Sequence, residues 1–169
     1  MNEKTVDKVS WQPGVAPIAV VLITLNEAHN LEEALDNIKN WAQEVFIVDS
    51  FSQDATVDIA LRHGVHIVQR GFKGFGDQWN FALNGLPIAA HWTMKLDPDE
   101  RLSEELKDNI LEAITSDSCD SMEFHRRWWL MGTPLPIRDT VLRVWRTGLC
   151  SFSEVSVNEH PLIDGTTKF

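Results

Sequence analysis

The sequence predicts an α/β fold with a mostly parallel sheet and helices on both of its faces, followed by a β-rich portion. Two observations lead to this expectation. First, short and continuously apolar segments alternate four times with segments whose apolar residues recur at helical spacing. This alternation is typical of buried parallel strands joined by right-handed helical crossovers. Second, the alternation stops after Ser116, where further apolar segments follow without a helical segment between them.

The expected elements can be placed in order along the chain. Strands are expected at residues 18–23, 45–48, 65–69 and 92–96. Helices are expected at residues 31–42, 55–62, 77–84 and 103–114. Asn30 and Glu33 form a capping-box pattern before the first helix, and Gly64 and Gly85 are suited to end the second and third. In the β-rich portion, strands are expected at residues 122–129, 141–145 and 155–157, with residues 132–136 forming a loop.

These elements divide the 169 residues into three parts that are expected to form a single domain. Residues 1–17 form a polar lead-in, residues 18–116 form the α/β half, and residues 117–169 form the β-rich half.

Composition narrows the class of protein. The formal net charge of -10 argues against a nucleic-acid partner, although residues 125–146 are locally basic, with five arginines and one acid. Cys119 and Cys150 have neither metal-ligand spacing nor the density of a disulfide scaffold, which indicates a reduced cytosolic setting. The chain does not begin with a signal-peptide pattern, and no apolar run approaches the roughly 20 residues that span a bilayer. We therefore expect a cytoplasmic protein, either soluble or peripheral to a membrane.

Polar residues follow the expected strands at the edge where open α/β sheets bind ligands. Thr24 to Glu27 follow the first strand, Asp49 ends the second, and Asp97 and Asp99 follow the fourth. An acidic edge suits a diphosphate only when a divalent cation such as Mg²⁺ or Mn²⁺ bridges the two. Asp97 and Asp99, two residues apart at the end of a strand, can face the same side and hold such an ion. The alternative is a plain turn whose acids precede a helix.

Three other features each have more than one interpretation. Asp49 suits a hydrogen bond to a nucleobase, whereas Ser52 and Asp54 suit helix caps. Asn80 lies either at the ligand or on the surface. The Arg and Trp residues of 125–129 and 143–146 suit phosphate and sugar binding or an anionic membrane surface, or else form strands with buried Trp and solvated Arg.

Taken together, residues 18–109 resemble glycosyltransferase family 2, a family of inverting enzymes with the GT-A fold. Thr24 to Glu27 is similar to a Thr-x-Asn-Glu motif, Val48 to Thr56 to a Val-Asp-x-x-Ser-x-Asp-x-Thr motif, and Asp97-Pro98-Asp99 to the Asp-x-Asp motif. The segments Phe72 to Leu83 and Leu96 to Arg101 resemble the bacterial branch that adds glucose to the heptose of the lipopolysaccharide inner core, a β-1,4-glucosyltransferase type.

The resemblance implies a metal-dependent inverting transfer of a hexose, expected to be glucose from UDP-glucose, with Mg²⁺ or Mn²⁺ as cofactor. The acceptor would be a saccharide or lipid-linked saccharide such as the lipopolysaccharide core, reached by peripheral contact at the inner face of the inner membrane. It also implies roles for particular residues. The residues expected to bind the nucleotide sugar are Thr24, Asn26, Glu27, Asp49, Asn80 and Asp97, and the metal is expected on Asp99.

The β-rich half departs from the family pattern. The usual Glu-Asp pair and Gln-x-x-Arg-Trp segment are not found as such, and Arg143 to Arg146 is a candidate stand-in for the latter. Residues 157–160 resemble a Val-His-Glu segment, which makes Glu159 the candidate catalytic base, together with Asp97 at the catalytic centre. His160 and Glu123 are alternatives, and Glu159 could instead be a turn residue before Pro161.

Two other function classes stay open. Family members generally continue through helical segments that complete the acceptor site and touch the membrane, so we expect the β-rich half to be truncated. A catalytically incomplete UDP-sugar-binding module is therefore the main alternative. A nucleotidyltransferase ranks last, because that class generally has a basic, glycine-rich loop where this chain has Asn26-Glu27-Ala28-His29.

Overall fold

A computed structural model describes residues 10–153 and 159–168 of the chain. Its centre is a seven-stranded sheet with the order β3-β2-β1-β4-β6-β5-β9. The four strands of the α/β half run parallel to one another. They are β1 (Ala16–Thr24), β2 (Ala42–Asp49), β3 (His66–Gln69) and β4 (Trp92–Lys95). The expected order of strands and helices in this half is confirmed, with shifts at several ends.

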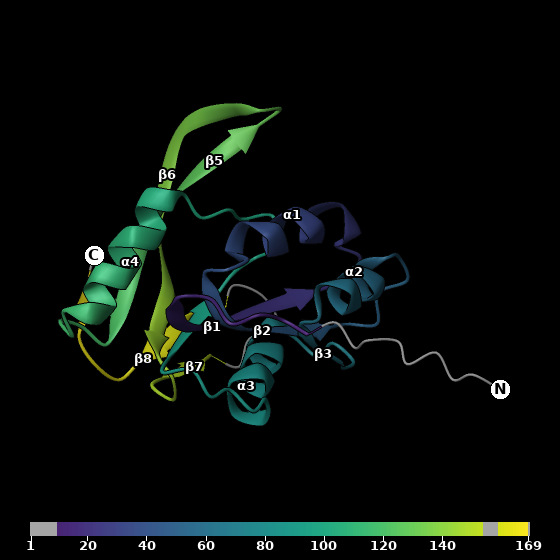
Figure 1. Ribbon diagram of the computed structural model, residues 1–169, viewed down its shortest axis with the longest axis horizontal. Helices are drawn as coiled ribbons and strands as arrows, with labels where there is room; N and C mark the ends of the chain where they lie inside the picture. Colours follow the sequence, from purple (N-terminus) through teal and green to yellow (C-terminus); the bar gives the residue numbers. More distant parts are fainter. Residues whose placement is uncertain (1–9, 154–158, 169) are drawn as a thin grey trace.

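Helices cover both faces of the sheet, as expected (Figure 1). The helices are α1 (Ala28–Ile38), α2 (Thr56–His63), α3 (Phe75–Gly85) and α4 (Glu104–Thr115). One apolar core joins alternate residues of β1 and β2 to α1, α2 and α4, whereas the other joins the opposite face of these strands to Trp79 and Ala82 of α3. The sheet is therefore apolar on both sides, which is why its strands have continuous rather than alternating apolar runs.

The first helix begins two residues before the predicted cap at Asn30, because its N-terminal amides are bound by another loop. The backbone N–H of Ala28 donates to Asp54 Oδ2, and that of Glu27 donates to Thr56 Oγ1. The expected capping box was therefore wrong. The helix also ends at Ile38, so that Ala42 begins β2 instead of continuing the helical stripe. Gly64 ends α2 with a φ of 69°, as its sequence position indicated.

The β-rich half adds antiparallel strands to the same sheet. β5 (Ser121–Leu130) and β6 (Thr133–Arg146) form a long hairpin, and β6 lies beside β4 with Met94 opposite Val144. The loop expected at residues 132–136 was mostly wrong, since β6 begins at Thr133. Two prolines made this segment look irregular. Pro134 and Pro136 lie where β6 pairs with β5 alone, so the missing N–H groups cost no bond to a second strand.

Three short strands complete the described part. β7 (Cys150–Phe152) pairs with β8 (Pro161–Ile163), and β9 (Thr167–Lys168) pairs with the start of β5. The strand expected at residues 155–157 lies outside the described residues. Among the described residues, no helix is long and apolar enough to cross a bilayer.

Candidate functional site

Asp49 lies at the carboxyl end of β2 and is completely buried. Its Oδ1 accepts hydrogen bonds from Thr24 Oγ1 and Ser52 Oγ, and its Oδ2 accepts from the Ser52 backbone N–H and Gln69 Nε2. The three strand ends of β1, β2 and β3 are thus tied together through one carboxylate. A nucleobase could reach Asp49 only if it replaced one of these donors, so the predicted direct contact stays a prediction.

These hydrogen bonds also control the charge of Asp49. Burial by itself would raise the pKa of the carboxyl group, but the donors of Ser52, Gln69 and Thr24 outweigh burial and hold the pKa below its usual value. Asp49 is therefore a carboxylate at neutral pH.

We expect Asp49 to make the folded protein sensitive to acid. Because its folded pKa lies below its unfolded pKa, its stabilisation is fully present above the unfolded value of about 3.9 and is lost as the pH falls through the folded pKa. Urea unfolding at a series of acidic pH values should show a steeper loss of stability in the wild type than in Asp49→Asn. Asp58→Asn, on the exposed side of α2, is the matched control and should keep the wild-type slope. Equal slopes in the wild type and Asp49→Asn would contradict this expectation.

The loop after β1 is held against the loop after β2. Asn26 has a left-handed φ of 56°, a conformation that Asn tolerates, and its side-chain Oδ1 accepts from the backbone N–H of Gln53 at 2.8 Å. Its own N–H donates to Ser52 Oγ at 2.8 Å. The Glu27 side chain accepts from Asn30 and is half-buried. The structure thus brings Thr24, Asn26, Glu27 and Asp49 to one edge of the sheet.

The end of β4 carries the acidic segment that the sequence singled out. Asp97 accepts a hydrogen bond from Arg143 Nη2 at 2.8 Å, and the same nitrogen lies 2.5 Å from Glu100 Oε1. Arg143 comes from β6, next to β4, and its side chain is only 10% exposed. Asp99 is exposed, with its carboxylate at the surface. One arginine therefore fixes Asp97 and leaves Asp99 open to a ligand.

The charge network continues into the hairpin. Arg126 Nη1 lies 3.2 Å from Glu100 Oε1, and Arg126 Nη2 lies 2.6 Å from Asp139 Oδ2. The guanidinium group also stacks on the Trp128 ring, whose Nε1 donates to Asp139. Ion pairs with these partners raise the pKa of Arg126, first through the hydrogen bond to Asp139. The base of the hairpin is thus joined to the segment that follows β4.

Glu159 reaches the same edge from the segment that precedes β8. Its Oε1 lies 2.6 Å from Lys95 Nζ, and the two side chains are 11% and 9% exposed. The lysine ammonium also lies over the rings of Trp79 and Phe152, at 4.7 and 5.4 Å from their centroids. Glu159 thus pairs with the residue two positions before Asp97, and its role as the catalytic base stays a prediction.

Asn80 has a bracing role in this structure. Its Nδ2 donates to the Phe152 carbonyl at 2.9 Å, and its Oδ1 accepts from the Phe152 N–H at 2.8 Å. It thereby holds β7 against α3. The predicted contact of Asn80 with the nucleotide sugar would have to use the remaining capacity of this amide, and it stays a prediction.

The chain matches the sequence model of a protein family described as Glycosyl transferase family 2 over residues 19–136. The chain belongs to glycosyltransferase family 2. Among curated relatives, an uncharacterized glycosyltransferase of Rickettsia bellii is 39% identical over 103 residues, which are 61% of this chain and 34% of the relative. The lipopolysaccharide core biosynthesis glycosyltransferase LpsC of Rhizobium meliloti is 29% identical over 142 residues, covering 78% of this chain and 52% of LpsC. The family 2 chain thus spans about a third to a half of these relatives.

Solved structures support the same fold. Residues 1–349 of S. aureus TarS share 19% identity with this chain at a TM-score of 0.62, covering 78% of this chain and 47% of those 349 residues. Mannosyl-3-phosphoglycerate synthase from Rubrobacter xylanophilus has 20% identity and a TM-score of 0.52, and the match covers 62% of this chain and 38% of the synthase chain. At such identities the likeness establishes the fold alone, and it confirms the α/β arrangement of the family 2 chain.

Two residues of this candidate site are not among the site residues that the sequence predicted. Arg143 lies in a basic segment for which no individual role was predicted. Lys95 begins the segment that was predicted to bind the metal and the diphosphate, but it was given no role of its own. A signal existed for Lys95, because a charged residue at the end of an otherwise apolar, buried strand needs a partner. No comparable signal linked Arg143 to Asp97, since they are far apart in sequence and meet only through the pairing of β4 with β6.

The carboxylates fit a small divalent cation that is completed by a ligand. Within residues 10–153 and 159–168, no three His, Cys, Asp or Glu side chains gather into a metal cluster. Mg²⁺, however, commonly uses one or two carboxylates and takes its other oxygens from phosphates and water. The exposed Asp99 beside Asp97 offers this kind of incomplete oxygen donor set.

Proposed function

We propose that this chain is the donor-binding part of a metal-dependent inverting hexosyltransferase that uses UDP-glucose and transfers glucose to a saccharide acceptor of the lipopolysaccharide core. The observation that supports the proposal is the position of Asp97 and Asp99 directly after β4, while Glu159 pairs with Lys95 at the end of the same strand, next to β1 in the sheet. The family membership supports the reaction class. A structure of S. aureus TarS in complex with UDP, at a TM-score of 0.62, supports the choice of nucleotide. The name of LpsC supports the acceptor class.

In this proposal, the residues divide into donor binding and catalysis. Thr24, Asn26 and Glu27 contact the base and ribose, whereas Asp49 positions Thr24 and Ser52 from beneath. Asp97 contacts the sugar, held in place by Arg143. Asp99 binds Mg²⁺ or Mn²⁺, which when present neutralises charge on the departing diphosphate.

Transfer with inversion requires one base. The acceptor oxygen forms a bond to the anomeric carbon while the bond from that carbon to the diphosphate oxygen breaks, and UDP leaves with the electron pair. Glu159 takes the proton of the acceptor hydroxyl. The ion pair with Lys95 occupies one of its carboxylate oxygens, so we expect Lys95 to turn toward the diphosphate when the donor is bound. Asp97 is the other candidate for this proton.

We also propose that the protein works in the cytoplasm and associates peripherally with the inner face of the inner membrane. An acceptor in the lipopolysaccharide core is carried by a lipid, so the enzyme must meet it at a membrane surface.

Titration calorimetry with UDP tests the metal site. UDP should bind the wild type more tightly with Mn²⁺ than without it, and Asp99→Ala should lose this difference, because the exposed carboxylate supplies the protein ligand. Asp108→Ala, which removes an exposed acid of α4, is the matched control and should behave as the wild type. Equal metal-dependent binding by the wild type and Asp99→Ala would refute the role of Asp99.

Turnover separates an enzyme from a binding module. Release of UDP from UDP-glucose with a core saccharide acceptor should be detectable in the wild type and lost in Asp97→Asn. UDP binding without any release would favour the catalytically incomplete UDP-sugar-binding module.

A further inference from the structure

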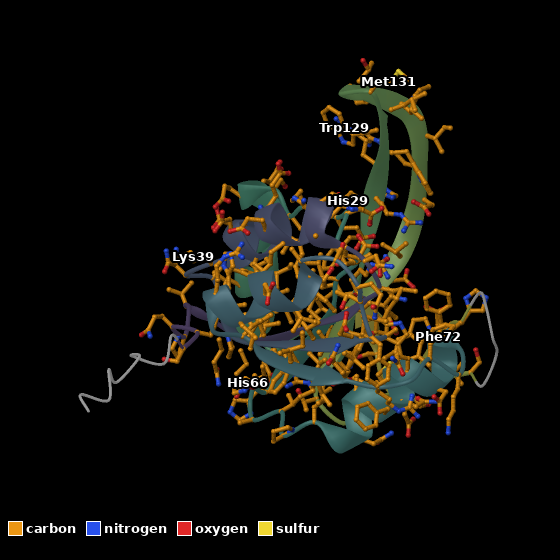
Figure 2. All side chains as sticks on the ribbon, turned by 90° about the vertical axis from the view of Figure 1, so that its right-hand side faces the viewer. His29, Lys39, His66, Phe72, Trp129 and Met131 are labelled. Atoms are coloured by element: carbon orange, nitrogen blue, oxygen red, sulfur yellow. The ribbon has the colours of Figure 1, made fainter. Side chains whose placement is uncertain are left out.

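The β5–β6 hairpin extends away from the rest of the protein and exposes large apolar side chains at its end (Figure 2). The exposed fractions are 60% for Trp129, 59% for Leu130, 98% for Met131 and 55% for Ile137. We call these four residues the hairpin tip. They form an apolar group remote from both cores of the sheet. Such a concentration of exposed apolar side chains marks an interaction surface.

The turn of the hairpin shows that an apolar residue is placed there against local preference. Leu130 pairs with Thr133, so Met131 and Gly132 alone form the connection, with φ values of 49° and 76°. A two-residue turn with two positive φ values strongly favours Asn, Asp or Gly. Met at the first of these positions is strained, and at 98% exposure it gains nothing from burial within the described residues. Apolar surroundings outside the chain would compensate for this strain.

Charge at the hairpin is opposite to that of the whole chain. Arg127 and Arg138 lie directly opposite each other in the β5–β6 pairing, and both are exposed. Neither has a carboxylate within 4.0 Å among residues 10–153 and 159–168. Like charges in directly opposed positions repel each other. In a chain with a formal net charge of -10, this pair forms a local site for an anionic surface.

The base of the hairpin is fixed by the charge network described above. Arg126 joins Asp139 of β6 to Glu100, which follows the acidic segment of β4. The hairpin tip therefore has a set direction relative to the proposed donor site. Any surface that the hairpin tip binds would therefore have a fixed position relative to the proposed donor site.

We propose that the hairpin tip inserts into the interface of an anionic phospholipid bilayer, with Arg127 and Arg138 binding lipid phosphates. Trp suits the boundary between headgroups and acyl chains, while Leu, Met and Ile suit the apolar side of it. Exposed arginines attract anionic lipids. This inference rests on the proposed peripheral membrane association, but it does not depend on the transfer reaction.

Co-sedimentation with lipid vesicles tests the inference. The wild type should bind vesicles that contain phosphatidylglycerol, bind weakly to vesicles of phosphatidylcholine alone, and lose affinity as salt increases. Arg127→Gln and Arg138→Gln should each weaken binding about fivefold at low salt. Lys39→Gln, which removes an exposed cation at a distance from the hairpin, should leave binding unchanged (Figure 2).

Met131→Asn is the most informative variant. Asn suits the positive φ of this turn, so the variant should keep or raise the melting temperature while it weakens vesicle binding severalfold. Leu61→Asn removes another exposed apolar side chain, on α2, and should not change vesicle binding.

Two results would overturn the inference. One is vesicle binding that is unaffected by Met131→Asn and by both arginine variants. The other is a chain that ignores vesicles and instead forms dimers that Met131→Asn dissociates, since a second copy would then cover the tip. Vesicle binding and UDP binding are measured separately. If the protein does not bind UDP, the vesicle experiments still test the membrane role of the hairpin tip.

Discussion

The Glu159→Gln variant is expected to lower kcat about 10³-fold while leaving UDP affinity nearly unchanged. Gln keeps the size and hydrogen-bonding oxygen of the side chain but cannot take the acceptor proton. Lys95 would lose its ion pair at 2.6 Å but keep its position over Trp79 and Phe152, so the fold around β4 should persist. Steady-state release of UDP, together with calorimetry for UDP, measures the two quantities.

The controls for this prediction separate catalysis from structure. Asp164→Asn replaces an exposed acid just after β8 and should keep the wild-type kcat. If Glu159→Gln keeps its kcat while Asp97→Asn loses it with UDP affinity retained, Asp97 is the base and Glu159 is a partner for Lys95 only.

The second large effect is expected on stability, from Arg143→Met. Arg143 is 10% exposed and pairs with both Asp97 and Glu100. Without it, the repulsion between these two neighbouring carboxylates is less well balanced by positive charge. Removing one partner of a buried charge pair typically costs about 3–5 kcal/mol, and because Asp97 is 38% exposed we expect the lower end, about 3 kcal/mol. For a chain of 169 residues this corresponds to a fall in melting temperature of about 10 °C. Urea unfolding and thermal scans measure it.

Arg146→Met provides a matched control on the same strand. Arg146 also pairs with two acids, Asp117 and Asp120, but is 34% exposed, and exposed ion pairs contribute about 1 kcal/mol or less. Adding Glu100→Gln to Arg143→Met should recover part of the lost stability, since it removes one of the two carboxylates that Arg143 had held together. If Arg143→Met and Arg146→Met lower the free energy of unfolding equally, burial of the ion pairs of Arg143 does not increase their contribution to stability.

Much of the α/β half was predictable, because its signals are local. An apolar run followed by a helical stripe identifies a buried strand and its crossover, and the polar residues at strand ends follow directly. Thr24, Asp49 and Asp97 could therefore be placed at one edge of the sheet from these local patterns alone. The family motifs agreed with this placement and with the match over residues 19–136.

Errors arose where a residue's partner comes from a distant segment. Asn30 has a sequence pattern suited to a helix cap, yet Asp54 and Thr56 bind the N-terminal amides of α1 from the next loop. Pro134 and Pro136 indicated a loop, yet they lie in a strand that has a partner on one side only at that point. Local preference was outweighed in both places by pairing between segments.

By itself, the sequence determined the fold class, the order of the α/β elements and the edge where ligands are expected, because these depend on patterns within short windows of the chain. Only the tertiary structure decided which charges meet. Arg143 reaches Asp97, and Glu159 reaches Lys95, through the packing of β6 and of the segment before β8 beside β4. It also showed that Asp49 is saturated by four donors, and that the hairpin tip is exposed. Contacts between distant residues leave no periodic pattern in sequence, and exposure depends on everything that packs nearby.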